Sequence, residues 1–310
     1  MDGQTGRSGL DCVAFEQAFR KLLQGAVTHP AATKCLDLAE ADIAELERLR
    51  ERLHEFGDQQ LDFAVRNTRT RLANRESLAN YDYKLVSLGT DCLSRTIPTR
   101  WGLKPPKSLG ERTHPFDLAV HPYEAVCEVL DRDFEDYLDV KWLGMNNLNY
   151  VFHKKLKVHF NHEKGETFSA NDYSYFIEQY QRRINNLRED VASHPILYLL
   201  HLTASRVPCR LYEILARKST HDFTLLAIST ANEPFDETAT ADALPGLILE
   251  HIPYPYPGYV WHVPVHYASP AGQAFDRRIV AAVRRAIVER FPLRKPEPAS
   301  LDPQATAAAA

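Results

Sequence analysis

The stretch YKLVSLGTDCLSR, residues 83–95, places a thiol directly after a short apolar run and a glycine. The run 84–89 predicts a buried strand, and Cys92 follows Gly89 by three residues. A strand, a glycine turn and a helix start would put the thiol near unpaired backbone N–H groups, which together with the helix dipole stabilise a thiolate. The same donors can stabilise an oxyanion. Cys92 is therefore a candidate nucleophile, and a buried structural cysteine is the alternative that spacing alone slightly favours.

A thiol nucleophile needs a base, and the densest group of histidines is VFHKKLKVHFNHEK, residues 151–164. It holds His153, His159 and His162. If residues 156–162 form a strand, His159 and His162 point to opposite faces, so a shared metal ion is the minority interpretation. These histidines are equally consistent with surface positions, and His201 is a second candidate base.

The segment HPFDLAVHP, residues 114–122, contains an acid between aromatic and aliphatic neighbours. Asp117 is predicted to be partly buried, and a buried carboxylate needs partners. It can orient a catalytic histidine, cap a helix that starts near Pro122, or pair with Arg95 or Arg112. The structural roles together outweigh the catalytic one.

The elements that would position these residues alternate between strands and helices, which predicts an α/β fold. We expect a mostly parallel, Rossmann-like sheet flanked by helices. The strands expected in it cover residues 84–89, 195–203, 223–230 and 247–254, and the helices between and after them cover 209–218 and 272–291. Nearly continuous apolar runs such as PILYLLHLT are typical of strands buried on both faces.

Four further elements are expected before the second parallel strand. Residues 92–101 can form a helix, interrupted at Pro98. The other three are helices over 122–138 and 171–191 and a strand over 155–162. Ligands of parallel sheets bind outside the carboxyl ends of the strands, so residues that directly follow a strand are candidates for substrate contact.

The segment YPYPGYVWHVPVHY, residues 254–267, concentrates tyrosines, a tryptophan, prolines and two histidines in one loop. Rigid aromatic loops of this kind line ligand sites, where sugars or peptides stack on the rings, or simply cover the edge of a sheet. From the strand ends and this loop, the predicted substrate-binding residues are Gly89, Thr90, Asp91, His201, Tyr256 and Trp261.

Three regions are predicted along the chain. Residues 1–80 carry an apolar stripe at helical spacing and form a helical hairpin or small bundle. Residues 81–293 form the α/β unit that carries the chemistry, and residues 294–310 are a disordered tail. The helices most simply pack on the rest of the protein, although they can also bind a protein partner.

Composition excludes several classes of function. The net charge of −4 gives no reason to expect nucleic acid, and no apolar run is long enough to span a membrane. The start of the chain is not a secretory signal, and five scattered cysteines indicate reduced thiols in a cytoplasmic protein. Phosphate-binding glycine loops and zincin motifs are absent from the sequence, so no metal and no required cofactor are expected.

Several of these segments, taken in order, resemble a bacterial family of unknown function described as papain-like cysteine peptidases. The resemblance rests on VSLGTDC, PFDLAV, CEVLDRDFEDYLD, KVHFNHE, YFIEQYQRRINNLRED and PILYLLHLT, and it covers residues 83–230. It implies Cys92 as the thiol and His162 as the histidine, and it draws attention to Asp117. Leu118 departs from the pattern, because the family usually has tryptophan there.

A parallel sheet does not suit the papain fold, whose catalytic histidine lies on an antiparallel sheet. Cysteine and histidine on a parallel sheet look more like an acyltransferase or esterase, and enzymes of that sort use acyl-coenzyme A to modify bacterial polysaccharides. The first hypothesis is therefore a Cys–His hydrolase or acyltransferase with acyl-coenzyme A as a possible co-substrate. The alternatives are a protein that binds or transfers a small molecule, carbohydrate or peptide without covalent catalysis, and an interaction protein that uses its N-terminal helices.

Overall fold

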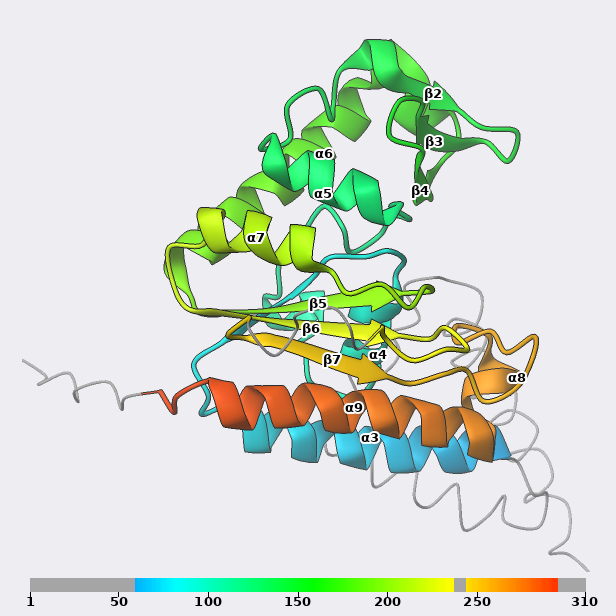
Figure 1. Cartoon of the computed structure of the whole chain (residues 1–310). Helices are drawn as coiled ribbons and strands as arrows, with labels where there is room; N and C mark the ends of the chain where they lie inside the picture. The colour runs from blue at the N-terminus through cyan, green and yellow to red at the C-terminus, as the bar shows by residue number, and fades with distance from the viewer. Residues whose placement is uncertain (1–58, 237–243, 295–310) are drawn as a thin grey trace, which may run out of the picture.

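The computed structural model describes residues 59–236 and 244–294 of the chain. Its centre is a four-stranded parallel sheet with the strand order β1-β5-β6-β7 (Figure 1). The strands are β1 Lys84–Ser87, β5 Ile196–Leu202, β6 Phe223–Ser229 and β7 Leu247–His251. The parallel sheet predicted from the apolar runs is confirmed, with strand ends that differ by up to three residues.

Helices cover both faces of this sheet (Figure 1). On one face lie α3 Gln59–Leu78, α4 Leu93–Arg100 and α9 Pro270–Arg290, and on the other lie α5 Tyr123–Asp131 and α7 Cys209–Lys218. Side chains alternate along β5. Leu197 and Leu199 pack in the hydrophobic core on the side of α4 and α9, while Tyr198 and Leu200 pack in the core on the side of α5 and α7. Burial on both faces explains why β5 reads as an unbroken apolar run.

A separate three-stranded antiparallel sheet was not expected. It has the order β2-β3-β4 and consists of β2 Leu143–Met145, β3 Tyr150–His153 and β4 Val158–Lys164. The strand predicted over residues 155–162 therefore exists, but it belongs to this second sheet. The long helix α6 Glu166–Ser193 packs against it and leads back to β5. The expectation that cysteine and histidine both lie on the parallel sheet was wrong for His162, because β4 is antiparallel.

The helices also differ in detail from expectation. Helix α4 runs through Pro98, although an interruption was expected there. Helix α5 ends at Asp131, because the following residues adopt turn conformations with positive φ at Asp133, Phe134 and Asp136. Helix α6 begins before the predicted start and bends where residues 170–173 leave helical geometry. The remaining elements are the short helix α8 Pro264–Tyr267 and the 3₁₀ turns η3 Lys107–Leu109 and η4 Val140–Trp142.

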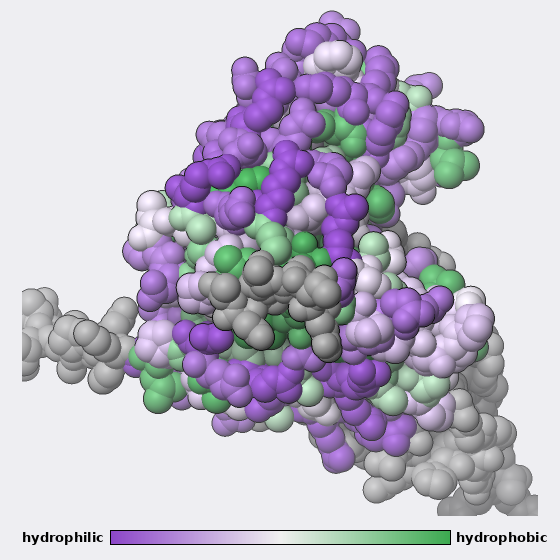
Figure 2. Space-filling view, in the orientation of Figure 1, coloured by the Kyte–Doolittle hydropathy of each residue, from purple (hydrophilic) through white to green (hydrophobic). Residues whose placement is uncertain are grey.

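Part of the predicted N-terminal helical region and nearly all of the predicted tail lie outside the described residues. Within the described ranges, no helix is both long and apolar enough to cross a membrane. Figure 2 shows a mostly hydrophilic face with small, separated hydrophobic patches. The outline is indented between the antiparallel sheet and the α8 side of the parallel sheet, the two regions that carry His162 and the aromatic loop.

Candidate active site

The turn after β1 holds Cys92 at the start of α4. Gly89 has a φ of +87°, a left-handed conformation that glycine adopts without strain, so the predicted glycine turn is present. Ser94 fastens the helix to the strand, because its hydroxyl donates to the Gly89 carbonyl at 3.1 Å and lies 2.6 Å from the Ser87 hydroxyl. Cys92 is the N-cap residue of α4 and is 7% exposed. The Cys92 thiol therefore lies beyond the carboxyl end of β1, which is an edge strand of the parallel sheet.

A two-residue bridge joins this turn to the antiparallel sheet. His121 N–H donates to the Thr90 carbonyl at 2.8 Å. Its neighbour Val120 exchanges two backbone hydrogen bonds with His159 of β4, at 2.8 and 3.0 Å. Residues 120–121 therefore carry β4 to the end of β1, which brings the histidine cluster to the thiol.

An irregularity in β4 then determines which side chain faces the thiol. Val158 and Phe160 are buried in regular alternation, but the next buried residue is Glu163. The register against β3 shifts at the same place, since Val151 pairs with Phe160 and Tyr150 pairs with Lys164. Such an irregularity re-aims side chains. Strict alternation predicted that His159 and His162 point to opposite faces, but β4 does not alternate strictly beyond Phe160.

His162 is the histidine that meets the thiol. Its Nε2 lies 3.5 Å from Cys92 Sγ, across 70 residues of sequence. The preceding residue, Asn161, also acts on the sulfur, where its side-chain amide favours the charged form. A thiol, a histidine nitrogen and an amide donor thus converge at one point.

The electrostatic setting of Cys92 differs from the expectation of a stabilised thiolate. Burial, and after it the charge of the adjacent Asp91 carboxylate, raise the pKa of the Cys92 thiol to about 12. Arg95 and Asn161 act in the opposite direction without balancing these effects. The helix start does not overcome desolvation here, so the resting group is a thiol.

Asp117 lies in this neighbourhood but has other partners. Its side chain is fully buried, and Oδ2 accepts from the His114 N–H at 2.8 Å and lies 3.4 Å from Arg95 Nε. Its Oδ1 has no hydrogen-bond partner among the described residues. Although burial opposes the effect, the charges of Lys104, Arg95 and His114 hold the pKa of Asp117 below its usual value. These contacts favour Arg95, rather than His162, as the group that Asp117 orients.

A second hydrogen-bonded chain lies behind the turn at the ends of β1, β5 and β6. His201 Nδ1 lies 2.9 Å from Asp91 Oδ1, and His201 Nε2 lies 3.0 Å from Thr230 Oγ1. Burial acts to raise the pKa of Asp91, but the charge and hydrogen bond of His201 lower it overall. The Asp91 carboxylate also accepts from the Leu93 N–H at 2.9 Å. This chain holds the loop that carries Cys92.

His201 is therefore placed as a support and not at the thiol. It is fully buried, and its backbone pairs with the turn: His201 N–H donates to Gly89 at 2.7 Å, and its carbonyl accepts from the Thr90 N–H and hydroxyl, each at 3.0 Å. Gly89, Thr90 and Asp91 thus share one partner. They shape the turn, and these contacts leave the Asp91 carboxylate directly beside Cys92.

The aromatic loop reaches the same region from the other side. The Trp261 side chain acts on the Asp91 carboxylate and favours its charged form. Tyr254, at the start of the loop, has a side-chain hydrogen bond with Thr230. Tyr256 is 37% exposed and packs against the rings of Tyr259 and His266. Trp261 therefore belongs to the surroundings of Cys92, while Tyr256 lies on the outer surface of the loop.

The remaining histidines of the predicted cluster do not meet the thiol. His153 is buried, and its Nδ1 accepts from the Leu156 N–H at 3.0 Å. His159 is exposed and packs on Phe152 with ring centroids 4.6 Å apart. Among the described residues, no group of three or more histidine, cysteine or acidic side chains is arranged to hold a metal ion.

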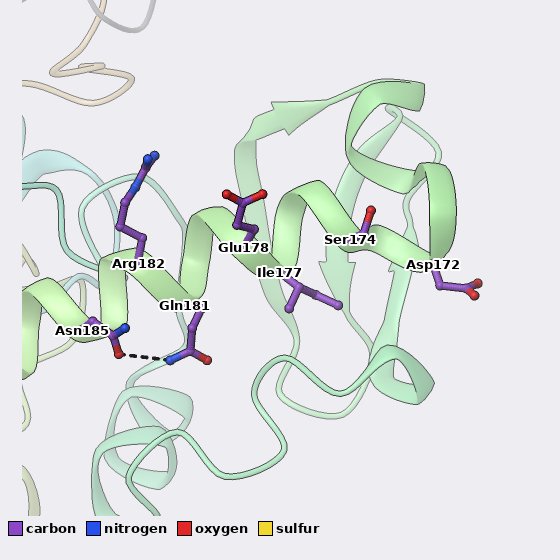
Figure 3. Close-up of a pocket in the computed structure, with 7 residues that line it drawn as sticks. All are labelled: Asp172, Ser174, Ile177, Glu178, Gln181, Arg182 and Asn185. Atoms are coloured by element: carbon purple, nitrogen blue, oxygen red, sulfur yellow. Dashed lines mark hydrogen bonds between the residues drawn. The ribbon is translucent and has the colours of Figure 1, made fainter.

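A surface hollow of about 640 Å³ lies along α6, away from these residues (Figure 3). Its walls are polar side chains of that single helix together with Ile177, and a Gln181–Asn185 hydrogen bond of 3.1 Å spans one end. A second cavity, of about 250 Å³, lies between α3 and the loop after α4, where Lys84, Lys104 and Glu111 form ion pairs. Neither hollow is lined by Cys92 or His162.

Sequence reasoning named both members of the Cys92–His162 pair but missed Asn161 and the charged side chains around them. Asn161 directly precedes His162, yet only the irregularity in β4 turns both residues toward the sulfur. Arg95 was considered only as a partner for Asp117. Comparison with known proteins adds no identity, since no protein-family model, no curated protein and no solved structure matches the chain.

Proposed function

We propose that the protein is a cysteine-dependent acyl-transfer or hydrolytic enzyme in which Cys92 is the nucleophile and His162 is the general base. One observation carries the proposal: His162 Nε2 lies 3.5 Å from Cys92 Sγ at the carboxyl end of a parallel strand. Nucleophile and base within hydrogen-bonding reach are the geometric signature of covalent catalysis. The ordered motifs that resemble a cysteine peptidase family support the same chemistry.

The raised pKa of Cys92 determines how the first step proceeds. Because the resting group is a thiol, His162 Nε2 accepts the Sγ proton as the sulfur attacks the carbonyl carbon of the acyl donor. The tetrahedral intermediate then expels the leaving group, which takes that proton from His162, and a thioester remains on Cys92. In the second step an acceptor or water loses a proton to His162 and attacks the thioester carbon. The C–S bond then breaks, the acyl group leaves on the acceptor or as the free acid, and His162 returns the proton to the Cys92 sulfur.

An oxyanion at the intermediate needs donors. Leu93 N–H is unavailable, since it donates to Asp91. The Cys92 N–H has no acceptor among the described residues, and the Asn161 amide already acts on the sulfur. We assign these two donors to the oxyanion, because preorganised donors beside a buried nucleophile stabilise developing charge strongly.

The aromatic loop forms one wall of the same site in this proposal. Trp261 reaches Asp91, which directly precedes the nucleophile. The loop therefore supports binding of a carbohydrate or peptide substrate at Cys92 and does not require a separate binding function. Acyl-coenzyme A is an acyl donor that this chemistry accepts.

The test is acylation by p-nitrophenyl acetate, followed by intact mass measurement and peptide mapping. We expect a burst of p-nitrophenol and the mass of one acetyl group on Cys92. Cys92→Ser abolishes the thioester, His162→Gln slows its formation, and Cys209→Ser is the matched control at a remote thiol. Equal acylation of Cys92 in wild type and His162→Gln would refute the proposed base.

A further inference from the structure

Arg95 stands on the same face of α4 as the nucleophile. It follows Cys92 by three residues in the first turn, and its N–H donates to the Cys92 carbonyl at 3.3 Å. Side chains three apart on a helix are neighbours. The guanidinium therefore lies beside the thiol, and its charge acts on the sulfur.

Among the described residues, the guanidinium of Arg95 has no hydrogen-bond acceptor. Its ion pair within these ranges is with Asp117, 3.4 Å from Nε to Oδ2, and Nε lacks hydrogen-bond alignment there. Arg95 donates no side-chain hydrogen bond to any described residue, although a guanidinium has five N–H donors and most buried donors are paired. Its side chain is 17% exposed, so it is held in the wall of the site and yet open on one side.

Neighbouring cations of the site differ in this respect. Lys104 donates to Glu111 at 2.7 Å and to the Leu85 carbonyl at 2.6 Å. Arg183 lies 2.8 Å from Glu163 and stacks over the Tyr180 ring. These two cations have close partners, whereas the pair that Arg95 forms within the described part of the chain, with Asp117, is longer at 3.4 Å.

Asp117 explains how Arg95 keeps its position. The carboxylate is fully buried and anchored by the His114 N–H, and it lies beside the Nε edge of the guanidinium. The outer edge carries two parallel N–H directions, and the side chain is 17% exposed. That edge matches the two oxygens of a carboxylate or phosphate. Asp117 is therefore a positioning residue for Arg95.

We propose that Arg95 binds an anionic group of the acyl substrate, a carboxylate or a phosphate, beside Cys92. This rests on the proposed function, since it assigns a substrate class to the same site. It goes beyond it because neither the Cys–His pair nor the aromatic loop requires an anionic substrate. The acyl donor then carries an acidic group a few atoms from the carbonyl that Cys92 attacks.

Two small alkylating reagents test this without the natural substrate. Iodoacetate and iodoacetamide differ chiefly in charge, so the ratio of their rates at Cys92 reports anion binding. We expect Arg95→Gln to lower the iodoacetate-to-iodoacetamide ratio roughly ten-fold, as for loss of a hydrogen bond to a charged group. The ratio cancels the general loss of thiol reactivity that removing this cation also causes.

Control variants separate direct binding of the anion by Arg95 from a general effect of positive charge on the protein. Arg182→Gln makes the same charge change in the hollow of Figure 3 and should leave the ratio unchanged. Arg95→Lys retains the positive charge but loses the two parallel N–H donors. Its iodoacetate-to-iodoacetamide ratio should therefore fall between those of wild type and Arg95→Gln. Succinate or inorganic phosphate should slow iodoacetamide labelling of the wild type, and whichever protects better identifies the anion.

An unchanged ratio in Arg95→Gln, together with no protection of the wild type by either anion, would overturn the anionic-substrate proposal. His162-dependent labelling by iodoacetamide would then still stand, so the Cys–His enzyme would survive. Conversely, labelling that is independent of His162 would refute the enzyme proposal, whatever the ratio shows. Thermal unfolding of each variant verifies the fold, and the protection experiment uses unaltered protein.

Discussion

His162 Nε2 and Cys92 Sγ lie 3.5 Å apart, although His162 lies in β4 of the antiparallel sheet and Cys92 lies at the start of α4, after β1 of the parallel sheet. The contact depends on the backbone bridge through residues 120–121 and on the irregular register of β4. Burial makes Cys92 a poor nucleophile by itself, since its pKa rises to about 12. In the proposed mechanism, the reactivity of Cys92 at neutral pH therefore depends on His162 as the base.

Asn161→Ala should slow acylation of Cys92 while leaving the fold intact. The amide favours the charged sulfur and is assigned to the oxyanion, and removing one such donor costs about 10²–10³-fold in rate. The rate of thioester formation from p-nitrophenyl acetate measures the effect. Asn186→Ala is a control amide on α6, whose side chain donates to the Thr113 carbonyl at 3.1 Å. A rate within two-fold of wild type, on the order of RT in activation free energy, would remove Asn161 from the site.

Asp91→Asn should shift the reactivity of Cys92 toward lower pH. The Asp91 carboxylate raises the pKa of the thiol, so its neutralisation makes the thiolate easier to form. The asparagine oxygen can still accept from the Leu93 N–H, which preserves the turn. The pH dependence of iodoacetamide labelling reports the shift. A profile displaced to higher pH would show that support of the loop, and not the charge of Asp91, dominates.

Asp190→Asn should reduce stability at neutral pH and change acid unfolding. Burial opposes ionisation, but hydrogen bonds and charges from His114, Lys84 and Arg112 lower the pKa of Asp190 to about 2. The unfolded chain binds its proton near pH 4, so this stabilisation is present above about pH 4 and is lost as the pH falls toward about 2.

The variant should lose about 2 kcal/mol in the free energy of unfolding at neutral pH, from the pKa difference alone. Urea unfolding at several pH values measures it, and the two proteins should converge near pH 2. A difference that stays constant across this range would assign the loss to packing instead. Asp131→Asn, which removes an exposed carboxylate paired with Arg217, is the matched control.

The parallel sheet could be predicted because its strands are buried on both faces and end at turns. Runs such as 196–202 and 223–229 carry their own signal, and α7 follows the predicted bounds 209–218. The hairpin of β2 and β3 carries no such signal. Its strands have three and four residues, one includes Gly144, and their pairing depends on β4 and α6.

The candidate site shows the same division. Cys92 and His162 could be named from a strand-turn-cysteine pattern and ordered motifs. The face of β4 on which His162 lies could not be predicted, because one register shift reverses the strand alternation. The pKa of Cys92 could not either, since desolvation by the folded chain outweighs the local helix start. Burial and register are tertiary properties, and these are what make the pair.

The most direct test is the rate of Cys92 alkylation by iodoacetamide as a function of pH, in wild type and in His162→Gln, with the modified residue identified by peptide mapping. With His162 as the base, wild type should react readily at neutral pH, because His162 Nε2 lies within reach of the Sγ proton. His162→Gln should be roughly 100-fold slower at neutral pH and recover only toward about pH 12. Superimposable profiles of the two proteins would contradict the Cys92–His162 assignment.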